Sequence, residues 1–81
     1  MYYLTLRKQD IILIMSFDAD NEYDTRFFDA LANKKRVVFL DGDKIKSLIL
    51  CDGDGGQICY ATGLKPRSIA ARLEKNYYLN I

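Results

Sequence analysis

Histidine is absent from this 81-residue chain. Its absence removes the commonest general base and the commonest metal ligand from any candidate site. None of the three serines lies in the Gly-x-Ser-x-Gly elbow of a serine nucleophile (Ser16, Ser47, Ser68). The sequence also has no glycine-rich loop followed by Lys-Ser or Lys-Thr, which would bind a phosphate group. These absences predict a protein that is not an enzyme and that holds no cofactor or metal.

Cysteine is scarce, and long apolar runs are missing. Two cysteines, Cys51 and Cys59, are too few for a disulfide scaffold. No apolar run approaches the length of a membrane span, and we expect no signal peptide. A net charge of +1 gives no overall attraction to nucleic acid or to an anionic membrane. We therefore expect a cytoplasmic protein with reduced thiols and no membrane partner.

The two cysteines flank a turn that reads Asp52-Gly53-Asp54-Gly55-Gly56. In a hairpin, Cys51 and Cys59 would be opposite or diagonal neighbours, which is compatible with a redox pair or two metal ligands. The chain has neither a histidine nor a second cysteine pair to complete a tetrahedral metal site. The turn itself lacks the later oxygen ligands of an EF-hand calcium loop. Two buried core thiols beside a tight turn are the favoured interpretation.

Three short apolar runs with Gly/Asp turns between them define the centre of the chain. Such a pattern is typical of a three-stranded antiparallel meander. The predicted strands are 36–40, 45–51 and 58–62, with turns at 41–43 and 52–56. Two further strands, 2–6 and 11–17, are separated by a short polar turn, and we expect them to form a hairpin.

Two segments have helical spacing of their apolar residues. The first helix opens at residues 18–22, where Asp18 or Asp20 can cap the free amides. Its expected inner face carries Tyr23, Phe27, Ala30 and Leu31, with Phe28 beside that stripe, and its outer face a Glu22–Arg26 pair.

The second helix begins at Pro66, which suits the first helical position because it has no amide hydrogen to leave unpaired. We expect Leu64 and Ile69 to form a hydrophobic staple, and Ile69, Leu73 and Tyr77 to share one face. The apolar tail, residues 78–81, either lies on the body of the protein or pairs as an edge strand.

These elements predict one α+β domain over residues 1–81, with the order ββαβββα, an antiparallel sheet of about five strands and two helices. The strands at 11–15, 37–40 and 48–51 are apolar at every position. A strand that is wet on one face should alternate, so both faces of the sheet need a cover. Either the two helices take opposite faces, or the second face meets the tail or another chain.

Charge is distributed unevenly over the two helices. Residues 10–29 carry six acidic side chains, whereas residues 63–81 carry four basic side chains against one acid. The candidate interaction surface is therefore the basic second helix with two lysines of the central strands: Lys65, Arg67, Arg72, Lys75, Lys44 and Lys46. A solvated basic face without a ligand is the simpler interpretation.

The order helix, three strands, helix between Asp20 and Lys75 resembles that of a double-stranded-RNA-binding domain. The segment from Gly63 to Ala71, which opens the last helix, carries that resemblance. In such domains, lysines at the start of that helix contact phosphates. This chain has no consecutive lysines there, and its strands are short.

The sequence carries no chemical motif that defines a function. A small domain with a sheet that is apolar on both faces and with many tyrosines has the features of a protein interface. We therefore expect a non-catalytic protein-binding module, which acts as a regulator, an inhibitor or a subunit by occupying the surface of another protein or of its own copy. Inhibitors encoded by phages and mobile elements are often of this size. The alternative is a nucleic-acid-binding domain that uses the second helix.

Overall fold

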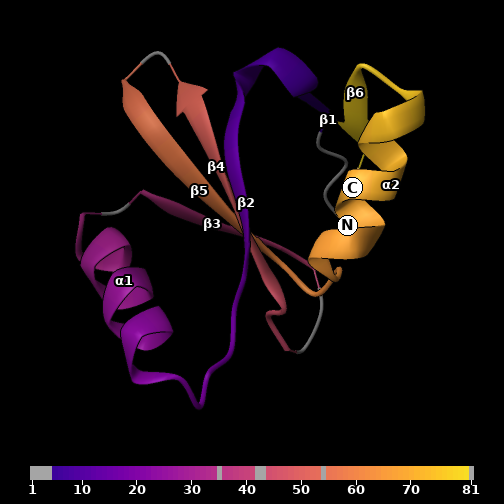
Figure 1. Ribbon diagram of the computed structural model, residues 1–81. Helices are drawn as coiled ribbons and strands as arrows, with labels where there is room; N and C mark the ends of the chain where they lie inside the picture. Colours follow the sequence, from indigo (N-terminus) through magenta and orange to yellow (C-terminus); the bar gives the residue numbers. More distant parts are fainter. Residues whose placement is uncertain (1–4, 35, 42–43, 54, 81) are drawn as a thin grey trace.

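A four-stranded sheet with the strand order β2-β4-β5-β3 divides the molecule into two halves (Figure 1). The structure is a computed structural model that describes residues 5–34, 36–41, 44–53 and 55–80. A second, two-stranded sheet pairs β1 with β6. The elements in chain order are β1 Thr5–Arg7, the 3-10 helix η1 Lys8–Asp10, β2 Ile11–Ser16, α1 Glu22–Asn33, β3 Val37–Asp41, β4 Ser47–Gly53, β5 Gly56–Thr62, α2 Pro66–Lys75 and β6 Tyr78–Asn80.

The α+β class and the two helices are confirmed, but the central strands do not form a meander. β4 and β5 make the predicted antiparallel hairpin, and Gly56 adopts a φ of 118° where that hairpin turns. β3 pairs instead with β5, in parallel, with Val37 opposite Cys59. A turn signal shows that the chain reverses direction, and it does not specify which strand becomes the neighbour. Of the turn predicted at 41–43, residues 42 and 43 lie outside the described residues.

The predicted N-terminal hairpin is also wrong, as far as its described residues extend. β1 pairs with β6, whereas β2 pairs antiparallel with β4. Between β1 and β2, η1 carries the chain from the small sheet to the large one, and an Arg7–Asp10 ion pair closes this turn at 2.7 Å. Leu6 of β1 and Leu79 of β6 are register partners, and both are buried. Burial of these two apolar side chains favours the long-range pairing over a local hairpin. The tail thus pairs as an edge strand, the second of the two options for it.

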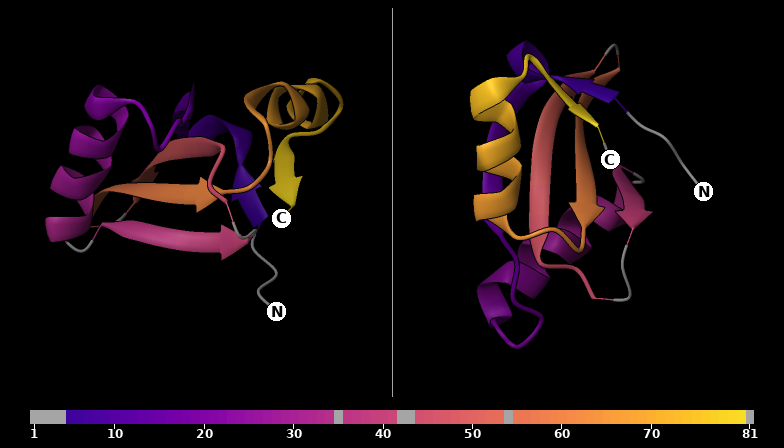
Figure 2. Two further views of the ribbon diagram at one scale, coloured as in Figure 1. Left: turned by 90° about the horizontal axis from the view of Figure 1, so that it is seen from below. Right: turned by 90° about the vertical axis from the view of Figure 1, so that its right-hand side faces the viewer.

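Each face of the large sheet packs against one helix, which explains why the central strand β4 is apolar on both sides, while the edge strands β2 and β3 keep exposed apolar residues. Ile49 and Cys51 of β4 pack with Ile69 and Leu73 of α2 and with the small sheet. The alternate residue Leu48 packs on the other face, with Phe28 and Leu31 of α1 among others. Figures 1 and 2 show α1 and α2 on opposite sides of the sheet, and β6 beside β1. The two helices therefore take opposite faces, as one of the two sequence alternatives required.

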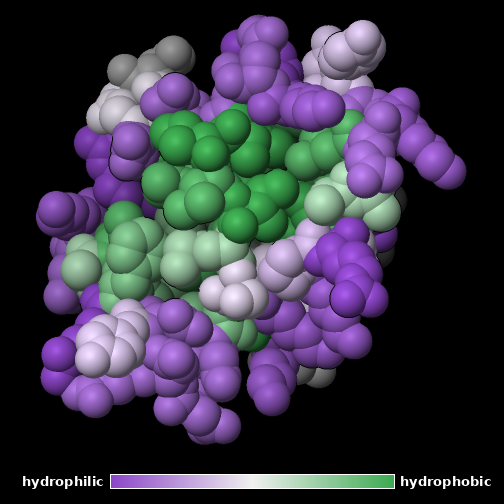
Figure 3. Space-filling view, in the orientation of Figure 1, coloured by the Kyte–Doolittle hydropathy of each residue, from purple (hydrophilic) through white to green (hydrophobic). Residues whose placement is uncertain are grey.

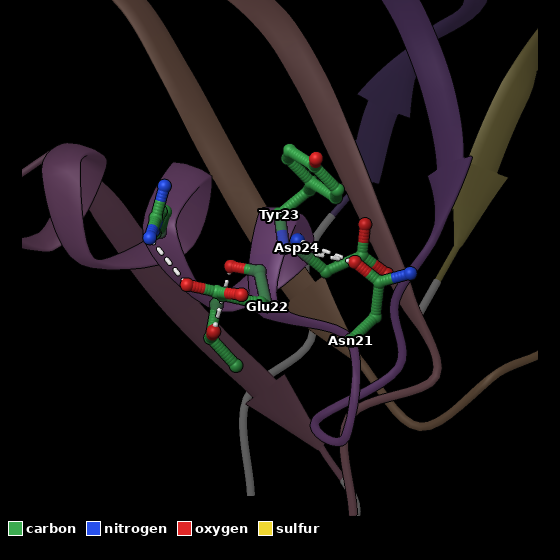
Figure 4. Close-up of polar contacts among 6 residues, drawn as sticks. Asn21, Glu22, Tyr23 and Asp24 are labelled. Atoms are coloured by element: carbon green, nitrogen blue, oxygen red, sulfur yellow. Dashed lines mark hydrogen bonds and ion pairs between the residues drawn. The ribbon is translucent and has the colours of Figure 1, made fainter.

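Asn21 caps α1, in place of the predicted Asp18 or Asp20. Its side-chain oxygen accepts hydrogen bonds from the backbone amides of Tyr23 and Asp24 at 2.9 and 3.1 Å (Figure 4). Asp18 shapes the preceding loop, because its Oδ1 accepts from the amide of Asp20 at 2.9 Å. The helix starts one position later than the acidic run indicates. The predicted Glu22–Arg26 ion pair is present on the exposed face.

The inner face of α1 is rotated relative to the predicted stripe. Phe28 and Leu31 pack against the sheet, whereas Tyr23 is 80% exposed and Phe27 is 38% exposed. The ring of Phe28 lies between those of Phe17 and Phe39, with centroids 5.4 and 5.7 Å away. One aromatic neighbour follows β2 and the other lies on β3, and these contacts favour turning Phe28 inward. Helical periodicity within α1 does not contain this information.

α2 follows the prediction at its start and departs from it at its end. Pro66 occupies the first helical turn, Ile69 and Leu73 are buried, and Leu64 packs in the same cluster as Ile69. Tyr77, predicted on the buried face, lies beyond the helix and is 82% exposed. α2 ends at Lys75 because the next residues turn into the extended conformation that leads to β6.

Candidate interaction surface

The six predicted interaction residues are all exposed, and they fall into two groups. The first group lies where β4 begins and α2 begins, and comprises Lys44, Lys46, Lys65 and Arg67. Two hydrogen bonds hold these segments together: Lys46 N donates to Thr62 O at 2.9 Å, and Ser47 Oγ donates to Leu64 O. Lys44 and Lys46 thus precede β4 and do not lie on a strand as predicted. The fold brings the segment that carries them next to the start of α2.

The second group, Arg72 and Lys75, lies in the last turn of α2. One α-helical residue adds about 1.5 Å, so the two ends of this ten-residue helix are separated by roughly 15 Å. Arg72 extends toward the small sheet, where its Nη1 donates to Asn80 O at 3.4 Å. The six cations are thus distributed over two sites at opposite ends of the helix.

An apolar surface that periodicity did not identify as exposed lies along β2. Ile12 and Leu13 are each 47% exposed, and Ile11 and Ile14 are half-buried beside them. Ile11 and Ile14 pack on the α2 face of the sheet, whereas the half-buried Leu50 of β4, which stands opposite Leu13, packs on the α1 face. What we call the β2 surface is therefore the edge of the sheet with the apolar side chains that flank it on both faces: Ile11, Ile12, Leu13, Ile14 and Leu50. Figure 3 shows a hydrophobic area over β2, bordered by hydrophilic residues. Contiguous apolar patches are uncommon on the surfaces of monomeric proteins, and they are typical of interaction sites.

The position of β2 in the sheet adds backbone groups to this surface. In the part of the chain that the structure describes, β4 is the single strand partner of β2, so β2 is an edge. No residue from 11 to 16 is charged, although edge strands are commonly protected by charged side chains. A bulge at Ile12 interrupts the register, while Leu13–Ser16 pairs regularly with β4. In the sequence, the signal for this edge was the unbroken apolar run of residues 11–15. That run was compatible with a strand covered by helices on both faces and with a strand that meets the tail or another chain.

The two cysteines do not form a site together. Cys51 packs on the α2 face of the sheet and Cys59 on the α1 face, and both are free thiols. Burial raises the pKa of each thiol to about 11, so both are protonated at neutral pH. Among the described residues, no group of three cysteine or acidic side chains is placed to hold a metal ion.

Comparisons with known proteins add no family to this description. The chain matches no protein-family model, no curated protein and no solved structure. The fold defines a small α+β domain with two sheets. Within the described residues, no helix is long and apolar enough to cross a membrane. The helix–strand order of the double-stranded-RNA-binding resemblance is present, but its three strands are not joined as a meander.

Proposed function

We propose that this protein is a small non-catalytic protein-binding module that occupies the surface of another protein, as a regulator, an inhibitor or a subunit. The observation that carries the proposal is the exposure of Ile12 and Leu13 on an uncharged edge strand. Both helices are already engaged with the sheet, and they leave these side chains in water. Contact with a partner would remove this apolar area from water, at about 25 cal/mol per Å² buried.

The β2 surface supports a particular mode of contact. A partner can lay apolar side chains on Ile12 and Leu13, and it can add a strand along Leu13–Ser16, where the register is regular. Main-chain hydrogen bonds would then give affinity, and the apolar side chains would give specificity. The acidic loop before α1, with Asp18 and Asp20, borders one end of β2 and would favour a partner that is basic at that end.

A charge placed on the β2 surface tests the proposal. Leu13→Lys should abolish partner binding, because a lysine would have to be desolvated at the centre of the contact. Val38→Lys is the matched control, since Val38 is 43% exposed on the other edge strand, β3. The tagged chain and both variants would be used to capture proteins from the native host. Each captured protein would then be purified and titrated against all three chains by calorimetry.

The proposal requires a purified partner that binds the parent chain and the Val38→Lys variant but not the Leu13→Lys variant. A partner that is the chain itself would appear in light scattering as a dimer, which Leu13→Lys dissociates. A chain that is monomeric at high concentration and titrates no partner contradicts the proposal. So does a partner that binds all three chains equally.

A further inference from the structure

A hollow lies between η1 and the junction of α2 with β6. It has a volume of about 520 Å³ and is lined by Arg7, Lys8, Gln9, Tyr77 and Tyr78. Small-ligand sites commonly have volumes of about 300–1,000 Å³. A second hollow of about 220 Å³ shares Lys8 and Tyr77 and adds Lys75 and Asn76 among its lining residues. Together they form what we call the tyrosine hollow, whose walls combine phenol rings with cationic groups.

The backbone fixes the two tyrosines where they stand. Lys8 N donates to Tyr77 O at 2.7 Å, and Tyr78 is the register partner of Arg7 in the small sheet. Both anchors belong to pairings between residues far apart in the sequence. Tyr77 is nevertheless 82% exposed and Tyr78 52% exposed, so the buried core does not account for their side chains. Two rings are thus held at one place on the surface by their backbone, so the backbone at this point is already ordered before a ligand stacks on them.

The cations around the tyrosine hollow retain donors for an anion. Arg7 donates from Nε and Nη2 to Asp10 at 2.7 and 3.2 Å, which engages two of the five guanidinium hydrogens. Lys8 Nζ donates to Leu73 O at 3.3 Å, and an ammonium group carries three hydrogens. Lys75 adds a third cation on the side of the smaller hollow. The linings of the two hollows contain these three cations and one acid, Glu74. Asp10 and Asp52 lie beside Arg7 outside these linings, so Lys8 and Lys75 contribute most of the positive charge.

We infer that the tyrosine hollow binds single-stranded nucleic acid. Bases stack on Tyr77 and Tyr78, and the backbone phosphates lie against Arg7, Lys8 and Lys75. Sites for single strands combine exposed aromatic rings with a cationic groove in this way, and they tolerate different sequences because every base has a flat face. A simple anion would use the cations without the rings, and a rigid duplex would bury its bases away from them. This site is separate in residues from the β2 surface, so the inference goes beyond the proposed function.

The test is fluorescence anisotropy of a short fluorescein-labelled oligothymidylate titrated with the full chain at low salt. Tyr77→Ala should weaken binding about tenfold or more, because a base loses its stacking partner. Tyr77→Phe should retain most of the affinity, since it keeps the ring. Tyr23→Ala is the matched control: Tyr23 is 80% exposed, close to the value for Tyr77, but it lies on α1. Circular dichroism melting would confirm that each variant folds.

A second pair of variants separates this site from a general attraction to positive charge. Lys8→Gln should weaken binding and reduce its salt dependence, whereas Lys46→Gln at the other end of α2 should leave both unchanged. Leu13→Lys on the β2 surface should not reduce binding either. Any of three results would overturn the inference: no binding at low salt, equal losses from Tyr77→Ala and Tyr23→Ala, or tighter binding of a duplex that depends on Lys46. None of these results bears on the partner titrations of the β2 surface.

Discussion

Cys59 stands directly opposite Leu50 in the β4–β5 hairpin, and Cys51 stands opposite Ile58. The two cysteines are therefore offset by one residue in register, and successive side chains of a strand point to opposite faces. Their sulfur atoms lie in separate apolar clusters on the two sides of the sheet. From the sequence we expect the two cysteines to be opposite or diagonal neighbours. The sequence shows which residues flank the turn, but it does not specify the strand register to within one residue.

Oxidation should not join Cys51 to Cys59 in the folded protein. A disulfide needs Cβ atoms that point toward each other, and these point away. Incubation with a mild oxidant, followed by intact-mass measurement, should show no loss of two hydrogens. The same treatment in denaturant is the control, since the unfolded chain can form the bond. Rapid intramolecular oxidation of the native chain would contradict the register.

Stability should decrease between about pH 9 and pH 11. The pKa of each thiol rises from an ordinary value of 9.0 to about 11 on folding, mainly because burial disfavours the thiolate. The folded state therefore binds more protons than the unfolded state in this range, and its stabilisation is present below pH 9 and lost as the pH rises through 11. Urea unfolding at several pH values would measure the decrease. The decrease should be smaller in the Cys51→Ala, Cys59→Ala double variant.

Asn21→Ala should lower the free energy of unfolding by about 1 kcal/mol, because two amides at the start of α1 lose their acceptor. Asp20→Ala is the matched control, since the sequence offers Asp20 as a cap and the structure does not use it. Thermal or urea unfolding of both variants would compare them. A larger loss from Asp20→Ala would place the helix start earlier than the structure does.

Ile49→Ala should be strongly destabilising, by about 2–5 kcal/mol, because Ile49 is fully buried at the centre of the α2 face. Ile12→Ala removes the same atoms from a side chain that is 47% exposed, and should cost far less. Urea denaturation gives both values. Similar losses at the two positions would mean that β2 is as buried as β4, and would remove the basis of the β2 surface.

The parallel pairing of β3 can be tested by crosslinking. In a background without native cysteines, Val38→Cys with Tyr60→Cys should form a disulfide, because these residues are register partners on neighbouring strands. Val38→Cys with Ser47→Cys, which a hairpin between the predicted strands 36–40 and 45–51 would place opposite each other, should not, because β5 lies between β3 and β4. Mass spectrometry of peptides from the oxidised variants would show whether each pair has formed a disulfide. The opposite result would restore the antiparallel meander predicted from sequence.

The features of the fold that could be predicted from the sequence are those set by a few neighbouring residues. Pro66 marked the start of α2, and the glycine-rich turn marked the β4–β5 hairpin, because each feature acts within a few residues. The neighbour of β3 was not predictable, since strand order depends on contacts that a turn signal does not encode. The position of Tyr77 was missed for a related reason. The helical spacing of apolar residues extends to Tyr77 in the sequence, but α2 ends at Lys75, where the chain turns to pair with β1.

The candidate sites show the same division. The basic residues were visible in the sequence, but their separation into two groups follows from the length of α2. The β2 surface and the tyrosine hollow depend on which residues the fold leaves uncovered. Leu13 is exposed because it lies on an edge strand outside both buried clusters, and the hollow results from the pairing of β1 with β6. Neither could be obtained from one segment of the chain considered by itself.

The pairing of β1 with β6 makes the two ends of the described chain one mechanical unit. Thr5 stands opposite Asn80, and its hydroxyl donates to Asn80 Oδ1 at 2.9 Å. A pull on both ends would therefore load this short clasp first, and its few hydrogen bonds would be sheared or peeled before the four-stranded sheet feels the force. Release of the clasp would uncover Leu6 and Leu79 and would separate the residues that line the tyrosine hollow, because Arg7 and Lys8 lie on one side of it and Tyr77 and Tyr78 on the other. The tyrosine hollow therefore exists only while the two ends of the described chain are held together.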